Sequence, residues 1–113
     1  LDASGKLDYA TEVQQIILHA MKGGECTLPR VAQMLGTSQR TLQRRLSAEG
    51  RTFRDELETV RSRVAMRYLE ETAIPLTSLS MTLGYSDLAA FSHAFRRMTG
   101  VSPSAWRKGK RAS

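Results

Sequence analysis

The sequence predicts an all-α fold of about seven helices. Along almost the whole chain, apolar residues recur three or four positions apart, the spacing that places them on one face of a helix. No stretch shows the sustained alternation of β-branched and polar residues that is typical of a strand. A third observation, a pattern of short helix, glycine and longer helix that occurs twice, indicates how the helices are grouped.

Caps and glycines divide the first half of the chain into three predicted helices. The first extends from about residue 8 to a pair of glycines. Thr27 is expected to cap a short second helix, which Gly36 ends, because glycine adopts the left-handed conformation that closes many helices. Ser38 is expected to cap the third, with Leu42 and Leu46 pointing inward.

A long helix is predicted over about residues 52–72, opened by a capping box of Thr52 and Asp55. It ends before Pro75, since the residue preceding a proline is pushed out of the helical region. Helices near residues 76–83 and 86–99 and a short helix around Trp106 follow. The residues expected to face inward on the two longer helices are Phe53, Leu57, Val60, Val64, Tyr68 and Leu69, and then Phe91, Phe95 and Met98.

An internal repeat relates the two halves. Under a shift of 48 residues, the positions that coincide are Leu28, Val31, Leu35, Gly36 and Ser38 with Leu76, Leu79, Leu83, Gly84 and Ser86. After the turn the second copy is one residue longer, so Leu42 and Leu46 correspond to Phe91 and Phe95. The repeat predicts two helix-turn-helix subdomains, at about 8–50 and 75–108, joined by a linker helix at 52–72 in a single domain of residues 1–113.

The composition restricts the class of partner. Lys and Arg number 17 against 11 acidic residues, and the resulting charge of +6 favours a polyanion such as DNA, RNA or an acidic membrane surface. No apolar run approaches the roughly 18 residues of a membrane span, so no membrane-spanning segment is expected, and a membrane is not among the predicted partners. Cys26 is the only cysteine, which excludes a disulfide framework or zinc cluster and suits a reducing cytosol. The chain starts without Met or a signal peptide, and we expect it to be a fragment of a longer protein.

The first predicted recognition helix offers long hydrogen-bond donors. In a helix-turn-helix the second helix lies in the major groove, where Arg pairs with guanine and Gln with adenine. The DNA-binding candidates of this copy are Ser38, Gln39, Arg40, Thr41, Gln43 and Arg44. The alternative, an ordinary solvated helix surface, is less favoured because the helix belongs to a repeated motif.

The second recognition helix has a different outer face. Its DNA-binding candidates are Ser86, Leu88, Ala89, Ser92, His93, Arg96 and Arg97. Leu88 and Ala89 either contact thymine methyl groups or are simply tolerated at the surface. His93 is a candidate donor to a phosphate or base, with an unremarkable surface histidine as the alternative.

The linker helix has the length of a spacer on DNA. About 20 residues span roughly 30 Å, close to the distance of about 34–36 Å between successive major grooves on one face of DNA. Its arginines either approach phosphates or form ion pairs with the neighbouring glutamates, and Arg61 is expected to be partly buried. The basic tail of Arg107, Lys108, Lys110 and Arg111 is expected to be a floppy end rather than a phosphate contact.

From Leu28 to Arg107 the chain resembles the AraC/XylS family of transcription regulators. The resemblance is carried by residues 83–87 (LGYSD), 91–97 (FSHAFRR), 99–103 (TGVSP) and 106–107 (WR), with residues 31–38 (VAQMLGTS) and 42–44 (LQR) similar to the family's first helix-turn-helix. It implies seven helices in two lobes that bind successive major grooves. Arg40, Gln43 and Arg44 match positions that read bases. Leu88, Ala89, Ser92 and His93 match groove-facing positions where relatives often carry Gln or Arg, and this departure predicts weaker direct readout by the second lobe.

The favoured function is therefore sequence-specific binding of double-stranded DNA for transcription regulation, as an activator, in the cytoplasm at the nucleoid. The resemblance further implies contact with RNA polymerase, and an effector-binding or dimerisation domain on a missing N-terminal part. A helical protein-interaction domain is the second hypothesis, and the arginines of the first face argue against it. An enzyme is not expected: no catalytic residues, cofactor or metal site are predicted, since His19 and His93 lie in different repeats and no ligand spacing is present.

Overall fold

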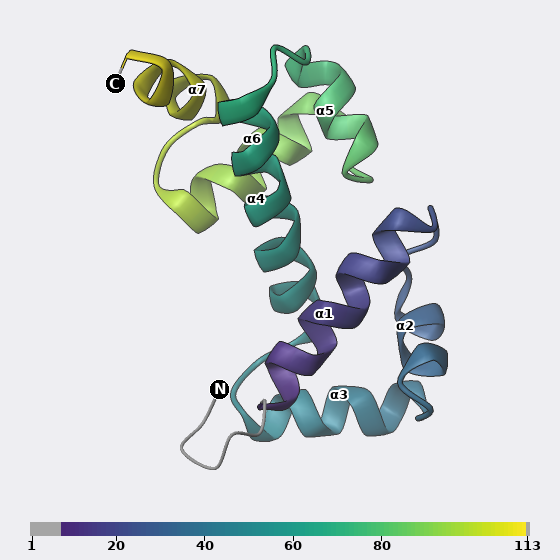
Figure 1. The fold of residues 1–113 in the computed structure, drawn as a ribbon. Helices are drawn as coiled ribbons and strands as arrows, with labels where there is room; N and C mark the ends of the chain where they lie inside the picture. The colour runs from purple at the N-terminus through teal and green to yellow at the C-terminus, as the bar shows by residue number, and fades with distance from the viewer. Residues whose placement is uncertain (1–7, 113) are drawn as a thin grey trace. The chain divides into compact units, whose positions relative to one another are not determined.

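The computed structural model describes residues 8–112, and within them it contains helices and no strand (Figure 1). The seven helices of this range are α1 (Tyr9–Lys22), α2 (Leu28–Met34), α3 (Gln39–Ala48), α4 (Phe53–Glu71), α5 (Leu76–Thr82), α6 (Leu88–Thr99) and α7 (Pro103–Ala112). The predicted all-α class and the helix number are confirmed.

Side-chain caps start the helices where the sequence predicts them. Thr27 accepts a hydrogen bond from the backbone N–H of Arg30, and Ser38 accepts one from that of Thr41. The capping box at the start of α4 is also present. The Thr52 N–H donates to Asp55 over 2.8 Å, and the Asp55 N–H donates to the Thr52 hydroxyl over 3.1 Å.

The cap of α6 is Asp87, whereas the prediction began this helix at about Ser86. The Asp87 carboxylate accepts from the N–H of Ala90 over 2.7 Å, and Ser86 lies before the helix. The extra residue of the second copy is therefore inserted in the turn. Since Leu42 lies four positions after Ser38 and Phe91 lies four positions after Asp87, the two caps are equivalent.

The turn that precedes each recognition helix has the same backbone geometry in both copies. Gly36 and Gly84 have φ angles of 70° and 93°, the left-handed region that favours glycine. Gly36 donates to the carbonyl of Gln33 and Thr37 to that of Ala32; 48 residues later, Gly84 and Tyr85 donate to the matching carbonyls of α5. The repeat read from the sequence is thus a repeat of hydrogen bonds.

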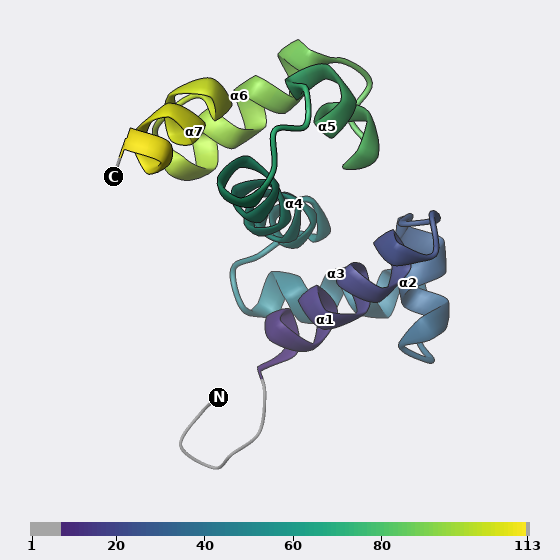
Figure 2. The same ribbon diagram turned by 45° about the horizontal axis from the view of Figure 1, so that its top comes forward.

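The chain divides into two compact units, with the boundary inside α4 between Val60 and Arg61. In the first unit α1 packs on α2 and α3, as Figures 1 and 2 show. In the second unit α6 packs on both α5 and α7. The large apolar core residues are Val13, Ile17, Val31, Leu42 and Leu46 in the first unit, and Leu69, Leu79, Phe91 and Phe95 in the second.

The burial of α4 differs from the predicted stripe. Of the six predicted residues only Val60 and Leu69 are buried, and Phe53, Leu57, Val64 and Tyr68 are half-buried. The buried positions are Glu56, Glu58, Val60, Ser62, Ala65 and Leu69. Glu56 and Val60 lie four positions apart on one side of the helix, whereas Glu58, Ser62, Ala65 and Leu69 follow a stripe on the opposite side. A single amphipathic stripe is therefore the wrong description of this helix.

Met98, predicted to face inward, is 40% exposed. Its neighbours Arg96 and Arg97 are exposed as well, so the last turn of α6 extends beyond the core. Phe91 and Phe95 are buried as predicted.

Candidate nucleic-acid interface

The first recognition face lies on α3. Leu42 and Leu46 are completely buried, which fixes the opposite side of the helix toward solvent. The candidate residues Ser38, Gln39, Arg40, Gln43 and Arg44 are all exposed, and Thr41 is half-buried. The structure therefore brings the predicted residues of the first copy together on one helix and its N-cap.

The side chains of Arg40 and Arg44 have no ion pair or hydrogen bond within residues 8–112. Other arginines of this unit are engaged by the fold: Arg45 stacks over the ring of Tyr9 at 3.8 Å, and Arg51 pairs with Glu56 at 2.8 Å. A guanidinium that the fold leaves unpaired keeps all five N–H donors for a ligand. The two unpaired guanidinium groups of α3 are therefore exposed on the outer side of the helix-turn-helix.

Ser38 and Thr41 already interact with each other. The Ser38 hydroxyl accepts from the Thr41 N–H at 3.1 Å and donates to the Thr41 hydroxyl oxygen at 3.0 Å. Ser38 is therefore occupied by helix capping. The Thr41 hydroxyl accepts the Ser38 proton and keeps its own proton, which remains available to an acceptor outside the domain.

The second recognition face lies on α6. Ala89, His93, Arg96 and Arg97 are exposed, and Leu88 and Ser92 are half-buried. Ser86 is exposed in the turn before the helix rather than on it. The predicted residues of the second copy are thus brought to one side of α6, except Ser86.

The equivalence of the two caps gives the register between the recognition helices. Gln39 and Arg40 of α3 correspond to Leu88 and Ala89 of α6, and Gln43 and Arg44 correspond to Ser92 and His93. Arg96 and Arg97 correspond instead to Ser47 and Ala48. At about 1.5 Å per residue, the arginines of α6 lie roughly 10 Å further toward the C-terminal end than Arg40 does on α3.

A contact from α4 fixes the turn before α6. The Arg61 guanidinium lies 4.5 Å from the centre of the Tyr85 ring and donates to the Gly84 carbonyl over 3.4 Å. A Cβ atom on Gly84 would come within 2.9 Å of this guanidinium. Arg61 is half-buried, as expected, and its contacts are with the protein.

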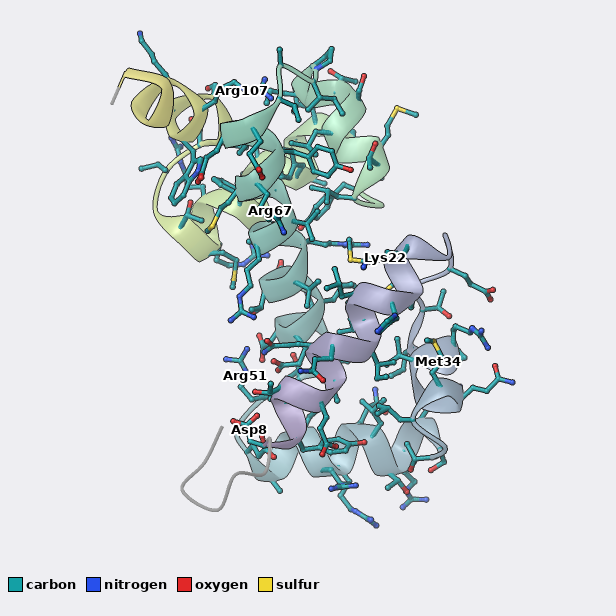
Figure 3. All side chains as sticks on the ribbon, in the orientation of Figure 1. Asp8, Lys22, Met34, Arg51, Arg67 and Arg107 are labelled. Atoms are coloured by element: carbon teal, nitrogen blue, oxygen red, sulfur yellow. The ribbon has the colours of Figure 1, made fainter. Side chains whose placement is uncertain are left out.

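Two other arginines of α4 support the ion-pair interpretation of this helix. Arg54 pairs with Glu58 at 3.9 Å, and Arg67, labelled in Figure 3, pairs with Glu71 at 3.3 Å. Both pairs join residues four positions apart on the helix surface.

The start of the basic tail is held in place, so the prediction of a floppy end is wrong for Arg107. Its Nε donates to the carbonyl of Leu69 over 3.3 Å, and the neighbouring Trp106 donates to Glu70 over 2.9 Å. Trp106 also packs edge-on against Phe95 at 5.8 Å. Residues 103–112 form α7, on which Lys108 is exposed, and the side chains of Lys110 and Arg111 lie outside the described part of the chain.

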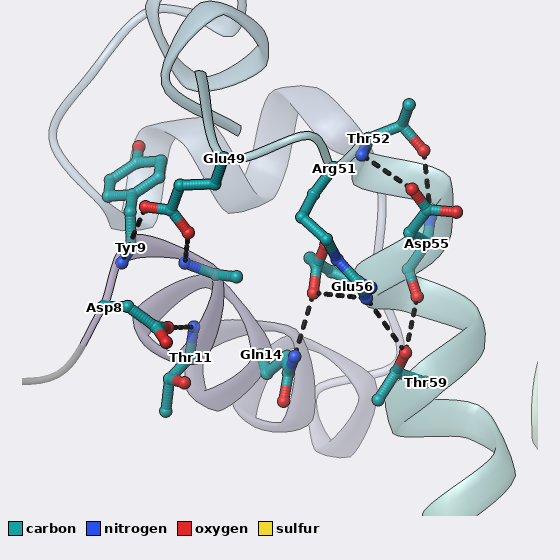
Figure 4. Close-up of polar contacts among 11 residues, drawn as sticks. Asp8, Tyr9, Thr11, Gln14, Glu49, Arg51, Thr52, Asp55, Glu56 and Thr59 are labelled. Atoms are coloured by element: carbon teal, nitrogen blue, oxygen red, sulfur yellow. Dashed lines mark hydrogen bonds and ion pairs between the residues drawn. The ribbon is translucent and has the colours of Figure 1, made fainter. Parts of the chain in front are cut away.

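A polar network in the first unit is not predicted from the sequence, in which the glutamates of the linker helix are expected only as partners of its surface arginines. Glu56 is completely buried and accepts hydrogen bonds from Gln14 and Arg51 (Figure 4). The bond to Glu56 raises the pKa of Arg51, so this arginine stays charged. Glu49, just after α3, accepts from the N–H groups of Tyr9 and Ala10 at the start of α1. The network ties α3 to its neighbours.

The capping carboxylates of the first unit have lowered pKa values. The Asp55 carboxyl is stabilised in its charged form by its hydrogen bonds with Thr52, which lower its pKa. The pKa of Asp8 is lowered in the same way by Thr11. Within residues 8–112 there is no group of three His, Cys, Asp or Glu side chains suited to a metal ion. No helix in the same range is long and apolar enough to cross a membrane.

Comparison with known proteins gives concordant matches. A family model described as a helix-turn-helix domain matches residues 31–109. The ornithine utilization regulator of Pseudomonas aeruginosa is 40% identical over 98 residues, which are 87% of this chain and 29% of that protein. The transcriptional activator NphR of a Rhodococcus species is 36% identical, with the same two shares of 87% and 29%. This chain thus spans less than a third of the length of either relative.

A solved structure of the same fold contains nucleic acid. It is the DNA-binding domain of AdpA, a global transcriptional factor, in complex with a target DNA. The sequences are 27% identical, the TM-score is 0.73, and the match covers 88% of this chain and 93% of that one.

Proposed function

This chain belongs to the AraC/XylS family of helix-turn-helix domains that bind DNA in transcription regulation, and we propose that it reads its target mainly through α3. The observation that carries the proposal is the pair of exposed, unpaired arginines, Arg40 and Arg44, on the outer face of that helix. Together with Gln43 they supply the bidentate donors that distinguish guanine and adenine in the major groove. Gln39 and Thr41 are assigned to the adjacent backbone and base edges, and Ser38, whose hydroxyl caps the helix, is assigned to orienting the Thr41 hydroxyl beside them.

The second helix-turn-helix is proposed to bind a neighbouring major groove with less direct readout. Arg96 and Arg97, far along α6, are assigned to phosphates, since the N-terminal part of a recognition helix is the part that meets base edges. Leu88, Ala89, Ser92 and His93 face the bases, and Ser86 lies at the edge of the contact. The lobe at 75–108 then contributes affinity and register more than sequence choice, and the lobe at 8–50 contributes specificity.

The regulatory role is proposed from the relatives. NphR is named a transcriptional activator, which supports an activating role for the protein that contains this domain. An effector site, dimerisation and a contact with RNA polymerase are assigned to the longer protein, acting at the nucleoid in the cytoplasm. The domain itself is proposed to have no enzymatic activity.

The test starts from a DNA site selected with this chain from a random pool. The affinity for every single-substituted duplex is then measured at fixed salt. Penalties of about 1–3 kcal/mol per base pair should cluster in one half of the site. Equal penalties in two half-sites one helical turn apart would contradict the unequal readout.

A salt series tests DNA binding itself. Roughly 5–8 phosphate contacts should give a slope of log K against log salt of about −5 to −7. A slope flatter than about −2 would instead support a protein-interaction domain.

A further inference from the structure

The N-terminal turn of α6 presents an apolar surface where α3 presents hydrogen-bond donors. Leu88 is half-buried and Ala89 is exposed, at the positions equivalent to Gln39 and Arg40. We infer that the second lobe reads the methyl groups of thymines through Leu88 and Ala89. This inference rests on the proposed placement of α6 in a major groove.

The chemistry of the groove favours thymine against this turn. Neither Leu88 nor Ala89 can hydrogen-bond through its side chain, so a guanine, adenine or cytosine edge pressed against them would lose water without gaining a partner. Thymine alone presents a methyl group there, and an apolar contact with that methyl removes carbon surface from water. Ser92, one turn further, is half-buried and short.

The distribution of charge along α6 also favours contact between its first turn and the bases. Asp87 at the N-cap carries a carboxylate where α3 has the neutral Ser38, and a carboxylate repels phosphate. Arg96 and Arg97 lie at the other end of the helix, where they are exposed. The DNA backbone is therefore attracted to the C-terminal part of α6, which leaves the apolar first turn to the bases.

The apolar turn is flanked by residues that pack in the second unit. Tyr85, two residues before the cap, contacts the Arg61 guanidinium at 4.5 Å from its ring centre, and its ring centre lies 5.5 Å from that of Phe91. Phe91 itself is buried and packs against Phe95. Leu88 and Ala89 lie between these fixed points, so their position is set by the core of the second unit.

The experiment replaces thymidine by deoxyuridine, one position at a time, in the selected duplex. This change deletes a methyl group and keeps every hydrogen-bonding atom of the base. At one or two positions in the half-site of the second lobe, the affinity should fall by about three- to fivefold, the factor that corresponds to one methyl-sized group. At the same positions, 5-methylcytosine should bind more tightly than cytosine. Thymines in the other half-site should tolerate deoxyuridine.

Two variants assign the effect to α6. Ala89→Ser keeps the size of the side chain and adds a hydroxyl, so the ratio of affinities for thymidine and deoxyuridine should approach one. Arg40→Ala should weaken binding and leave that ratio unchanged. If a specific site is bound but deoxyuridine is tolerated throughout, methyl reading by α6 is overturned and the proposed function stands. If Ala89→Ser keeps the full ratio, methyl reading through Ala89 is overturned, and again the proposed function stands. If no specific site is selected, the proposed function fails together with this inference.

Discussion

The recognition helices α3 and α6 follow the same turn and carry different chemistry. Each begins at a side-chain cap, follows a glycine of positive φ, and buries two large apolar residues four positions apart. On the outer side, however, α3 has arginines near its start and middle, Arg40 and Arg44, and α6 has them in its last turn. The comparison shows that the motif determines where a helix lies in its unit, and that the outer residues alone determine what it can read.

The two units also hold their recognition helices by different means. In the first, carboxylates bind the ends of neighbouring helices: Glu49 accepts from the start of α1, and Glu56 joins α1 to Arg51. In the second, a row of aromatic rings runs from Tyr85 through Phe91 and Phe95 to Trp106. The first unit is therefore expected to be more sensitive to pH, and the second to changes of side-chain volume.

The largest effects are expected from truncation of the core beneath each recognition helix. Phe91→Ala should lower the free energy of unfolding by about 3–5 kcal/mol, and Leu42→Ala by about 2–5 kcal/mol, because both side chains are buried. Hydrogen exchange should show the loss of protection in the unit that carries the change. Equal loss in both units after either substitution would show that they unfold as one.

A glycine-to-alanine pair sharpens the comparison of the turns. Both Gly36→Ala and Gly84→Ala place a side chain at positive φ, which costs about 1–2 kcal/mol. Only at Gly84 would the new Cβ meet another group, the Arg61 guanidinium at 2.9 Å, whereas the space beside Gly36 is open. Gly84→Ala should therefore destabilise by about 1 kcal/mol more than Gly36→Ala, since the stacking of Arg61 on Tyr85 is also disturbed. Thermal unfolding of the two variants measures this difference, and equal melting temperatures would argue against the role assigned to Arg61.

Substitutions on the outer faces test the division of work in DNA binding. Arg40→Ala and Arg44→Ala should each cost about 1–3 kcal/mol of binding free energy and relax the base preference within one half-site. Arg96→Ala should weaken all sequences alike and reduce the salt slope by about 1. The measurement is the affinity for the selected site and its single substitutions over a salt series. If Arg40→Ala and Arg44→Ala weaken all sequences equally, these arginines hold phosphates and their assignment to bases is wrong.

The smallest effect is a difference in acid sensitivity. The pKa values of Asp8 and Asp55 are lowered by their hydrogen bonds, so both carboxyls stabilise the fold above their unfolded pKa of about 3.9. That contribution is lost as the pH falls through their lower folded values. Both residues belong to the first unit, so its hydrogen-exchange protection should decline first below about pH 4. Asp55→Ala should cost about 0.5–1 kcal/mol at neutral pH and nearly nothing in acid. An identical cost at both pH values would contradict the capping role of the charged carboxylate.

Much of this fold follows from local signals in the sequence. The caps Thr27 and Ser38, the box of Thr52 and Asp55, and the glycine turns act within three or four residues, and these predictions are confirmed. The error at the start of α6 has the same local origin, because Ser86 and Asp87 are both good caps and only the register of Phe91 distinguishes them. The internal repeat distinguishes the two caps. Leu42 follows its cap Ser38 by four residues, and the residue four positions before Phe91 is Asp87.

The features that the sequence could not predict depend on contacts between distant segments. The burial of Glu56 requires Gln14, which is 42 residues away, and the order at Arg107 requires Leu69, which is 38 residues away. No periodicity within α4 or the tail shows these partners. For the candidate site, burial of the apolar pairs explains why the outer residues such as Arg40, Arg44 and His93 are exposed, whereas Thr41, Leu88 and Ser92 are half-buried and Ser86 lies before its helix. Which bases those residues contact stays a prediction.

The division of the chain inside α4 has a consequence for recombination between members of this family. In the first part of α4, Glu56 accepts a hydrogen bond from Gln14 of the first unit. In the second part, Arg61, Leu69 and Glu70 form hydrogen bonds with residues of the second unit. A chimaera joined in the loop after α3 would therefore separate the first lobe from the carboxylate that Arg51 and Gln14 require. A crossover within the helix, between Val60 and Arg61, keeps each set of partners in one parent. The natural module for exchanging DNA specificity is thus a helix-turn-helix plus its own half of the connecting helix.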